Sequence, residues 1–335
     1  MKTVKILSLF FLFAMAFFSC DMKINLHEQS ELEILHNSLH ANLASFDFIY
    51  DAERDLLYSD CDKYRVVLLV DNICIDDVEN YSLVIPYQIL YKIGGDILLS
   101  DSSIFDLSLP NRSSLLLSFD DCYLNNWLKH LSLFTDNKLK ATFFVYGTPS
   151  SLKSFAQTIQ KSKLEFGYHT LTHKKNLEDF CDEDNLKTEA INPAIELHKN
   201  YIYANSFALP NGAYIPYVID ELLKYYKIVR LYDSKFKLYK PEEIGKSRVI
   251  HSCAIDNNRF SDDETFEKVL FKRLLISRIS ESVFPCTSHN IVESLDDVSD
   301  SSYTITTSRL FYIIRCLEML NMKSSLYKDF YYYIY

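Results

Sequence analysis

The stretch that decides the fold is a short apolar run ending in two acids, Ser114-Leu115-Leu116-Leu117-Ser118-Phe119-Asp120-Asp121. The run has no helical period, which predicts a strand buried on both faces. Apolar residues then recur at helical spacing from Leu124 to Phe134, and a second strand is predicted at 141–146. The two carboxylates therefore lie at the carboxyl end of a strand, where α/β folds bind ligands.

A second polar motif follows downstream, where three residues separate His169 from His173. This spacing predicts a helical turn that presents both imidazoles on one face. An acid pair alone is more often a solvated turn or a helix N-cap, and a lone pair of histidines can arise by chance. Together with one carboxylate from Asp120 or Asp121, however, the histidines form a set that commonly holds a catalytic metal with an open position for water.

Strands and helices alternate along the rest of the chain. Strands are predicted at 164–168, 206–209, 228–231, 248–250 and 283–286, and helices at 151–161, 184–198, 217–226, 265–279 and 308–322. Pro193 is expected to kink the second of these helices. Repeated units of this length predict a parallel sheet, either open or closed. An earlier strand at 64–70 is expected to supply the first layer of the same sheet.

Five motifs resemble, in order and spacing, those of the polysaccharide deacetylases that share the NodB-homology fold. They lie at Ser118–Asp121, Ala141–Phe144, His169–His173, Phe207–Gly212 and Ser288–Ile291. The resemblance implies an α/β fold, specifically a distorted (β/α) barrel in place of a doubly wound sheet. It also implies a metal-dependent hydrolase that removes acetyl groups from N-acetylated glycans, with an N-acetylated polysaccharide or peptidoglycan as substrate.

The same resemblance implies a role for each matching residue. Asp120 would be the general base, and His289 would protonate the leaving amine. Asp121, His169 and His173 would hold a divalent metal, Zn²⁺ first, with Co²⁺ or Ni²⁺ as alternatives. A bound ion of this kind lowers the pKa of its water toward ~7. The oxyanion and the substrate would be contacted by Asn211 and Tyr214.

Three departures from the family pattern leave a second hypothesis open. Cys122 replaces the glycine that usually follows the acid pair, and Ala208 replaces the arginine that opens the third motif. Ala208 is shared with a branch that acts on poly-N-acetylglucosamine-type polymers. The Asp-rich fourth motif with its tryptophan is not found, and Arg248 and Asp256 are the candidates to replace it. The alternative is a non-catalytic, carbohydrate-binding pseudoenzyme on the same fold.

The amino terminus resembles a bacterial lipoprotein signal. Lys2 and Lys5 precede an apolar core at 6–18 that is too short to span a bilayer comfortably, and Ser19 precedes Cys20. Residues 1–19 are expected to be removed and Cys20 to be lipidated. The lipid would anchor the protein to a membrane of the bacterial cell envelope, facing the periplasm or the cell surface. An ordinary secretory signal and an N-terminal anchor are the alternatives.

Composition and charge indicate which binding partners and which cysteine chemistry to expect. The formal net charge of −10 argues against nucleic acid or an anionic bilayer surface. The eight cysteines include no Cys-x-x-Cys and no disulfide framework, so mostly buried free thiols are expected. The expected organisation is a tether at 20–62, a deacetylase-like domain at 63–325 and an aromatic tail at 326–335 that forms a last strand or contacts a partner.

Overall fold

The computed structural model describes residues 26–77, 82–91, 93–95, 100–174, 182–212, 215–260 and 262–334. The expected signal at 1–19, the lipidated Cys20 and the substrate contact at Tyr214 lie outside these residues. The chain forms two compact units, residues 1–46 and residues 47–335. Among the described residues, no helix has the length and apolar character needed to cross a membrane.

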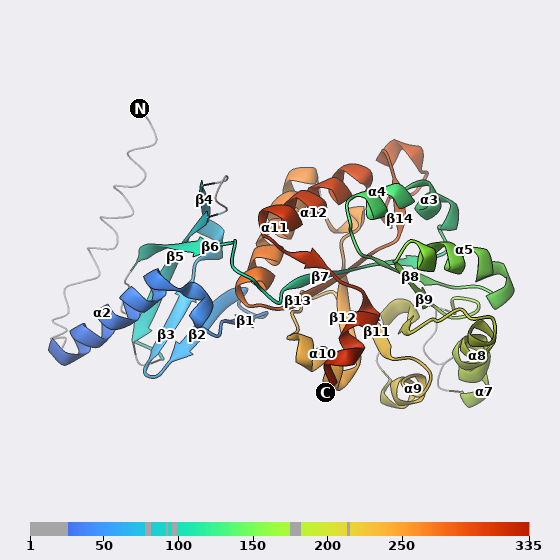
Figure 1. The fold of residues 1–335 in the computed structure, drawn as a ribbon, viewed down its shortest axis with the longest axis horizontal. Coiled ribbons are helices and arrows are strands. Elements are labelled where there is room, and N and C mark those ends of the chain that lie inside the picture. The colour runs from blue at the N-terminus through green and yellow to red at the C-terminus, as the bar shows by residue number, and fades with distance from the viewer. Residues whose placement is uncertain are drawn as a thin grey trace. The chain divides into compact units, whose positions relative to one another are not determined.

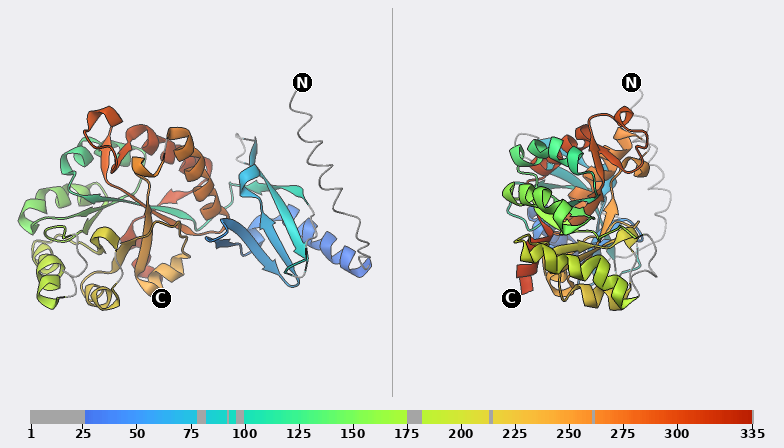
Figure 2. Two further views of the ribbon diagram at one scale, coloured as in Figure 1. Left: turned by 180° about the vertical axis from the view of Figure 1, so that it is seen from behind. Right: turned by 90° about the vertical axis from the view of Figure 1, so that its right-hand side faces the viewer.

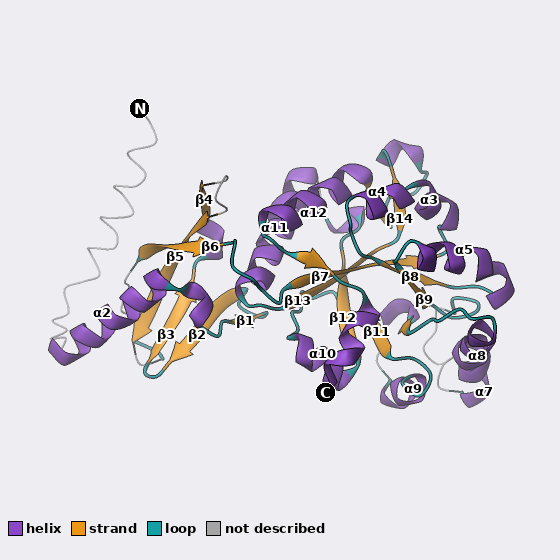
Figure 3. Cartoon of the chain, in the orientation of Figure 1, coloured by secondary structure: helices purple, strands orange, loops and turns teal. Residues whose placement is uncertain are grey.

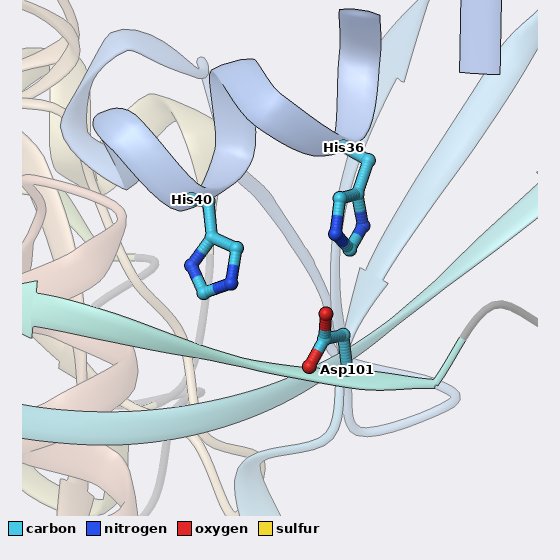
Figure 4. Close-up of side chains that lie close together, drawn as sticks. All are labelled: His36, His40 and Asp101. Atoms are coloured by element: carbon cyan, nitrogen blue, oxygen red, sulfur yellow. The ribbon is translucent and has the colours of Figure 1, made fainter. Parts of the chain in front are cut away.

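The described part of the first unit is helical. It consists of α2 (Leu26–Ala41) and a short 3₁₀ helix, η1 (Leu43–Ser45). His36 and His40 lie one turn apart on α2 (Figure 4), and their ring centroids are 5.5 Å apart. Figure 4 also labels Asp101, which is the first residue of strand β6 in the second unit.

The second unit begins with an antiparallel sheet (Figure 3). Its strands are β1 (Ile49–Asp51), β2 (Leu56–Cys61), β3 (Tyr64–Leu68), β4 (Cys74–Asp77), β5 (Ser82–Tyr91) and β6 (Asp101–Asp106). The strand expected at 64–70 is β3, but its expected place in the barrel is wrong. Its backbone groups pair with β2 on one side and β5 on the other. The boundary expected at residue 63 therefore falls inside this sheet, and the barrel strands begin at Ser114.

The remaining sheet closes into a parallel barrel. Its strands are β7 (Ser114–Asp121), β8 (Thr142–Val145), β9 (Glu165–Tyr168), β10 (Ser206–Ala208), β11 (Ile228–Tyr232), β12 (Val249–Ala254) and β13 (Val283–Ser288). Each strand pairs with the next along the chain, and β13 pairs back with β7 over the whole length from Val283 to Ser288. This closure confirms the expected distorted (β/α) barrel and excludes the doubly wound sheet.

Helices cover the outside of the barrel (Figures 1 and 2). They are α3 (Leu124–Lys129), α4 (Leu131–Asp136), α5 (Pro149–Lys161), α7 (Glu183–Leu186), α8 (Asn192–Lys199), α9 (Pro216–Leu222), α10 (Pro241–Ser247), α11 (Asp263–Ile279) and α12 (Thr307–Met319). Near the expected kink at Pro193, a π-helical segment at Lys187–Ile191 joins α7 to α8. Proline lacks the amide hydrogen that a continuous α-helix requires, and the wider turn accommodates this loss.

The carboxyl-terminal tail fills the end of the barrel opposite the acid pair. It forms a 3₁₀ helix, η7 (Tyr327–Ile334), after a short strand, β16 (Lys323–Ser324), that pairs with the start of β7. Tyr327 and Phe330 are buried against side chains from the barrel strands, including Phe144, whose ring lies 5.2 Å from that of Tyr327. The last strand expected at 326–335 is therefore wrong, because these aromatic side chains complete the barrel core.

The described cysteines, Cys61, Cys74, Cys122, Cys253, Cys286 and Cys316, all have free thiols. Of these, only Cys286 and Cys316 are buried, whereas Cys74 and Cys122 are exposed. The expectation of mostly buried thiols is therefore wrong for this part of the chain. Cys74 is exposed because it lies on β4, an edge strand that pairs only with β5 among the described strands.

Candidate active site

The expected site residues meet at the carboxyl end of the barrel. Asp120 and Asp121 end β7, His169 and His173 follow β9, and His289 follows β13. They line a cavity of about 570 Å³, together with Tyr146, Leu209, Asn211, Arg230, Tyr232, Ala254, Asn258, Arg259, Thr287 and Tyr303. All strands of a parallel barrel end on the same side, which brings together residues that are far apart in the sequence.

Asp120 forms a buried ion pair that the sequence analysis did not identify. Its side chain accepts a hydrogen bond from the guanidinium of Arg230 on β11. The side chains of Arg230 and Asp120 are only 2% and 7% exposed. The second carboxylate oxygen of Asp120, Oδ1, is also buried and has no hydrogen-bond partner among the described residues. One oxygen is thus fixed by the cation, while the other remains available to accept a proton.

Arg230 supplies the positive charge that appeared to be missing at Ala208. The two residues are direct neighbours on the adjacent strands β10 and β11. Side chains opposite each other on neighbouring parallel strands point to the same face, so Arg230 enters the barrel beside the small Ala208. A sequence signal existed, because Arg230 interrupts a buried apolar strand, and a buried cation requires a partner.

Asp121, His169 and His173 form the expected ligand set. Nε2 of His173 lies 3.1 Å from Oδ1 of Asp121, and Nε2 of His169 lies 3.8 Å from the same oxygen. One candidate ligand atom from each residue lies within 4.8 Å of the others. One carboxylate and two imidazoles, converging in this way, are donors that suit a divalent transition metal.

Hydrogen bonding and burial prepare His169 to act as a neutral ligand. Its Nδ1 lies 2.7 Å from the carbonyl oxygen of Ala208, which directs Nε2 toward Asp121. This second contact is typical of histidines that bind metals. Burial lowers the pKa of His169 to about 4, despite the opposing charges of Asp120 and Asp121. The imidazole is therefore unprotonated at neutral pH, which metal coordination requires.

The two histidines are brought together by a loop, so the expected helical turn is wrong. Thr170 and His173 have φ angles of 78° and 54°, which belong to the left-handed region. The buried carboxylate of Glu189 accepts hydrogen bonds from the backbone and hydroxyl of Thr172, at 2.9 and 2.7 Å. Glu189 thus holds the loop in shape from the π-helical segment, a role that the sequence analysis missed.

His289 is oriented by Asp256, which lies beyond the end of β12. Nδ1 of His289 lies 2.8 Å from Oδ2 of Asp256, and the backbone N–H of His289 donates to Oδ1 at 3.1 Å. Burial by itself lowers the pKa of His289, but the hydrogen bond and charge of Asp256 outweigh it and raise the pKa to about 9. His289 therefore carries a proton at neutral pH.

Comparison with known proteins adds an independent observation. Residues 109–226 match the family model described as polysaccharide deacetylase. The match covers the barrel strands from β7 to β10. A search of curated protein sequences found no match.

Solved structures of low sequence identity are similar to part of this chain. One is the Bc1960 peptidoglycan N-acetylglucosamine deacetylase, with 17% identity, a TM-score of 0.46, and coverage of 65% of this chain and 88% of that one. A family 4 carbohydrate esterase from Streptomyces lividans has 13% identity, a TM-score of 0.43 and coverage of 64% and 93%. Peptidoglycan deacetylase PdaC from Bacillus subtilis has 17% identity, a TM-score of 0.42 and coverage of 66% and 90%.

The departures from the family pattern have local explanations in the barrel. The left-handed backbone at the end of β7 falls on Asp121, with a φ of 84°, and Cys122 does not share it. Asp256 contacts His289, whereas Arg248 donates to backbone carbonyl oxygens of Leu223, Tyr226 and Lys227. Of the two candidates for the missing fourth motif, the structure therefore favours Asp256.

Two further residues contribute to the site. Asn211 lines the cavity and adopts a left-handed conformation, with a φ of 56°, which asparagine tolerates well. Trp127 of α3 is fully buried, and its indole N–H donates to the backbone carbonyl of His289 at 2.8 Å. Trp127 and Asp256 thus hold His289 from two sides.

Proposed function

We propose that the protein is a metal-dependent hydrolase that removes acetyl groups from N-acetylated glycans by amide hydrolysis. The observation that carries this proposal is the unpartnered, buried Oδ1 of Asp120, next to the ligand set of Asp121, His169 and His173. A divalent ion held by that set would supply Lewis acid chemistry, which acidifies water and polarises an acetyl carbonyl. Zn²⁺ is the proposed ion, with Co²⁺ and Ni²⁺ as alternatives.

The protein residues provide both proton transfers of such a reaction. Asp120 accepts a proton from the attacking water through Oδ1, while Arg230 compensates its negative charge. The water oxygen bonds to the acetyl carbon, and the bond between that carbon and the amide nitrogen breaks. His289, protonated at neutral pH, gives its proton to the departing nitrogen. The products are acetate and the free amine of the sugar.

The alternative is a non-catalytic protein that binds carbohydrate on the same fold. It rests on Cys122, Ala208 and the absent fourth motif. Three observations support the enzyme over this alternative: Arg230 pairs with the base, Asp256 pairs with His289, and the backbone at Cys122 is not left-handed. Acetate release from chitooligosaccharides, peptidoglycan and poly-N-acetylglucosamine tests the proposal.

His173→Ala is expected to lose most of its bound metal, because one of the three protein ligands is removed. Elemental analysis of the purified protein measures this loss directly. His198→Ala is a suitable control, since His198 is exposed on α8 and lies outside the cavity. Equal metal content in His173→Ala and the wild type would exclude the ligand assignment.

Asp256→Asn is expected to shift the alkaline limit of activity to lower pH. Without the carboxylate, burial still disfavours the charged imidazole, so the pKa of His289 falls from about 9 toward its ordinary value of 6.5. A general acid acts in its protonated form, so the alkaline limb of kcat/KM moves down by the same amount. An unchanged limb would show that His289 is not the acid.

The same substitution has a readout that does not depend on activity. A pKa raised by folding stabilises the protein fully below pH 6.5, and this contribution fades as the pH rises through about 9. Asp256→Asn should therefore lose more unfolding free energy at pH 6 than at pH 10. A loss that is independent of pH would indicate a packing role only.

We also propose that the protein is exported and anchored to a membrane of the cell envelope through a lipid on Cys20. The charged start, the short apolar core and the Ser19-Cys20 pair support this location. One acyl chain anchors only marginally, so the two or three chains of a lipoprotein are required. Cys20→Ala should move the protein to the soluble fraction or leave an unprocessed precursor. Normal processing and unchanged fractionation would contradict lipidation.

A further inference from the structure

The cavity contains one arginine that the proposed chemistry does not use. Arg259 ends η5 (Asn257–Arg259), the short 3₁₀ helix that follows β12, and its exposed side chain lines the cavity. Its guanidinium carbon lies 5.5 Å from the centroid of the Tyr232 ring, which also lines the cavity. The aromatic ring supports the guanidinium without using its N–H donors.

Arg259 has no ion pair within the part of the chain that the structure describes, although acidic residues outnumber basic ones in the sequence by 45 to 35. Acids close to Arg259 in the sequence have other partners. Asp256 accepts hydrogen bonds from Ser288 and His289, and Asp263 accepts one from Arg309. The other arginine of the cavity, Arg230, is engaged by Asp120. Of the two arginines that line the cavity, Arg259 is therefore the one whose guanidinium can bind a ligand.

Backbone hydrogen bonding joins the segment that carries Arg259 to the segment that carries Tyr303. The backbone N–H of Asn258 donates to the carbonyl of Ser302 at 3.1 Å. The next residue, Tyr303, is 53% exposed, and its ring lies 5.1 Å from that of His289. Arg259 and Tyr303 thus belong to one wall beside the residue that protonates the leaving nitrogen.

We propose that Arg259 determines specificity by binding a carboxylate on the glycan, so that the preferred substrate is an N-acetylated glycan with acidic sugars. A guanidinium binds a carboxylate through two parallel hydrogen bonds. The exposed ring of Tyr303 offers an apolar face to a sugar of the same chain. This inference rests on the proposed function, because it names the class of substrate for the same site.

The test uses two N-acetylated oligosaccharides of equal length, in which alternate sugars carry either a carboxylate or its neutral amide. Binding is measured by calorimetry and turnover by acetate release. The wild type is expected to bind the carboxylate form about tenfold more tightly, equivalent to about 1.4 kcal/mol. Arg259→Gln should lose this preference and Arg259→Lys should keep part of it. The preference should also weaken with added salt.

Arg315→Gln is the matched control. Arg315 is also an exposed arginine beside a tyrosine ring, 5.8 Å from the centroid of Tyr312, but it lies on α12 outside the cavity. Its replacement should leave the preference for the carboxylate form intact.

Equal affinity of the wild type for the two forms, or an undiminished preference in Arg259→Gln, would overturn the inference. If the inference fails in this way, acetate release from the neutral form would still support the proposed function. If instead the wild type prefers the carboxylate form in binding but releases no acetate, only the proposed function is refuted.

Discussion

Asp120→Asn is expected to keep its metal and its affinity for glycan while losing about 10²–10⁴-fold in turnover, the usual contribution of a positioned acid–base group. The amide leaves Asp121, His169 and His173 in place, but it removes the proton acceptor and the negative charge that faces Arg230. Metal content, glycan binding and acetate release, measured on the same preparation, separate these effects.

Asp121→Asn provides the comparison that distinguishes the two neighbours. It removes a charged ligand, so metal content and turnover should both fall. A solvated turn would tolerate asparagine equally at either position. If the two variants lose metal and turnover in the same proportion, the division of roles between Asp120 and Asp121 is wrong.

Arg230→Met is expected to cost about 3–5 kcal/mol of unfolding free energy, because it leaves a buried carboxylate without its cation. Turnover should fall as well, since Arg230 fixes the orientation of Asp120. Adding Asp120→Asn to this variant should recover part of the lost stability, because the uncompensated charge is removed. Urea unfolding of the wild type, both single variants and the double variant measures this coupling.

An exposed pair serves as the control for Arg230. Arg54 lies 3.7 Å from Asp51, and its side chain is 71% exposed. Exposed pairs contribute about 0–1 kcal/mol, so Arg54→Met should be nearly neutral. A similarly small loss in Arg230→Met would mean that the buried pair with Asp120 contributes little, and Arg230 would then have no positioning role.

Features set by local sequence were predictable. The apolar run of β7, the acids at its end and the strand–helix alternation depend on residues close together in the chain, and all three are present in the structure. The sheet to which β3 belongs was not predictable, because an apolar strand pattern does not indicate which strand is its hydrogen-bonding neighbour. The spacing of His169 and His173 fits a helical turn, but it fits equally well a loop with left-handed residues.

Contacts across the barrel explain the remaining differences. Arg230 reaches Asp120 over a separation of 110 residues, and Asp256 reaches His289 over 33. Neither pair has a spacing that a periodic pattern can reveal. A buried charge within an apolar strand gives a usable signal, since it requires a partner, but that signal does not identify the partner.

The most direct test of metal-dependent deacetylation is acetate release from N-acetylated glycans by one protein preparation in three states. These are the purified protein, the protein after chelation, and the chelated protein resupplied with Zn²⁺, Co²⁺ or Ni²⁺. Acetate release is expected in the first state, a loss in the second and recovery in the third. A protein with full metal content that binds a glycan and releases no acetate would contradict the proposed activity and support a carbohydrate-binding pseudoenzyme.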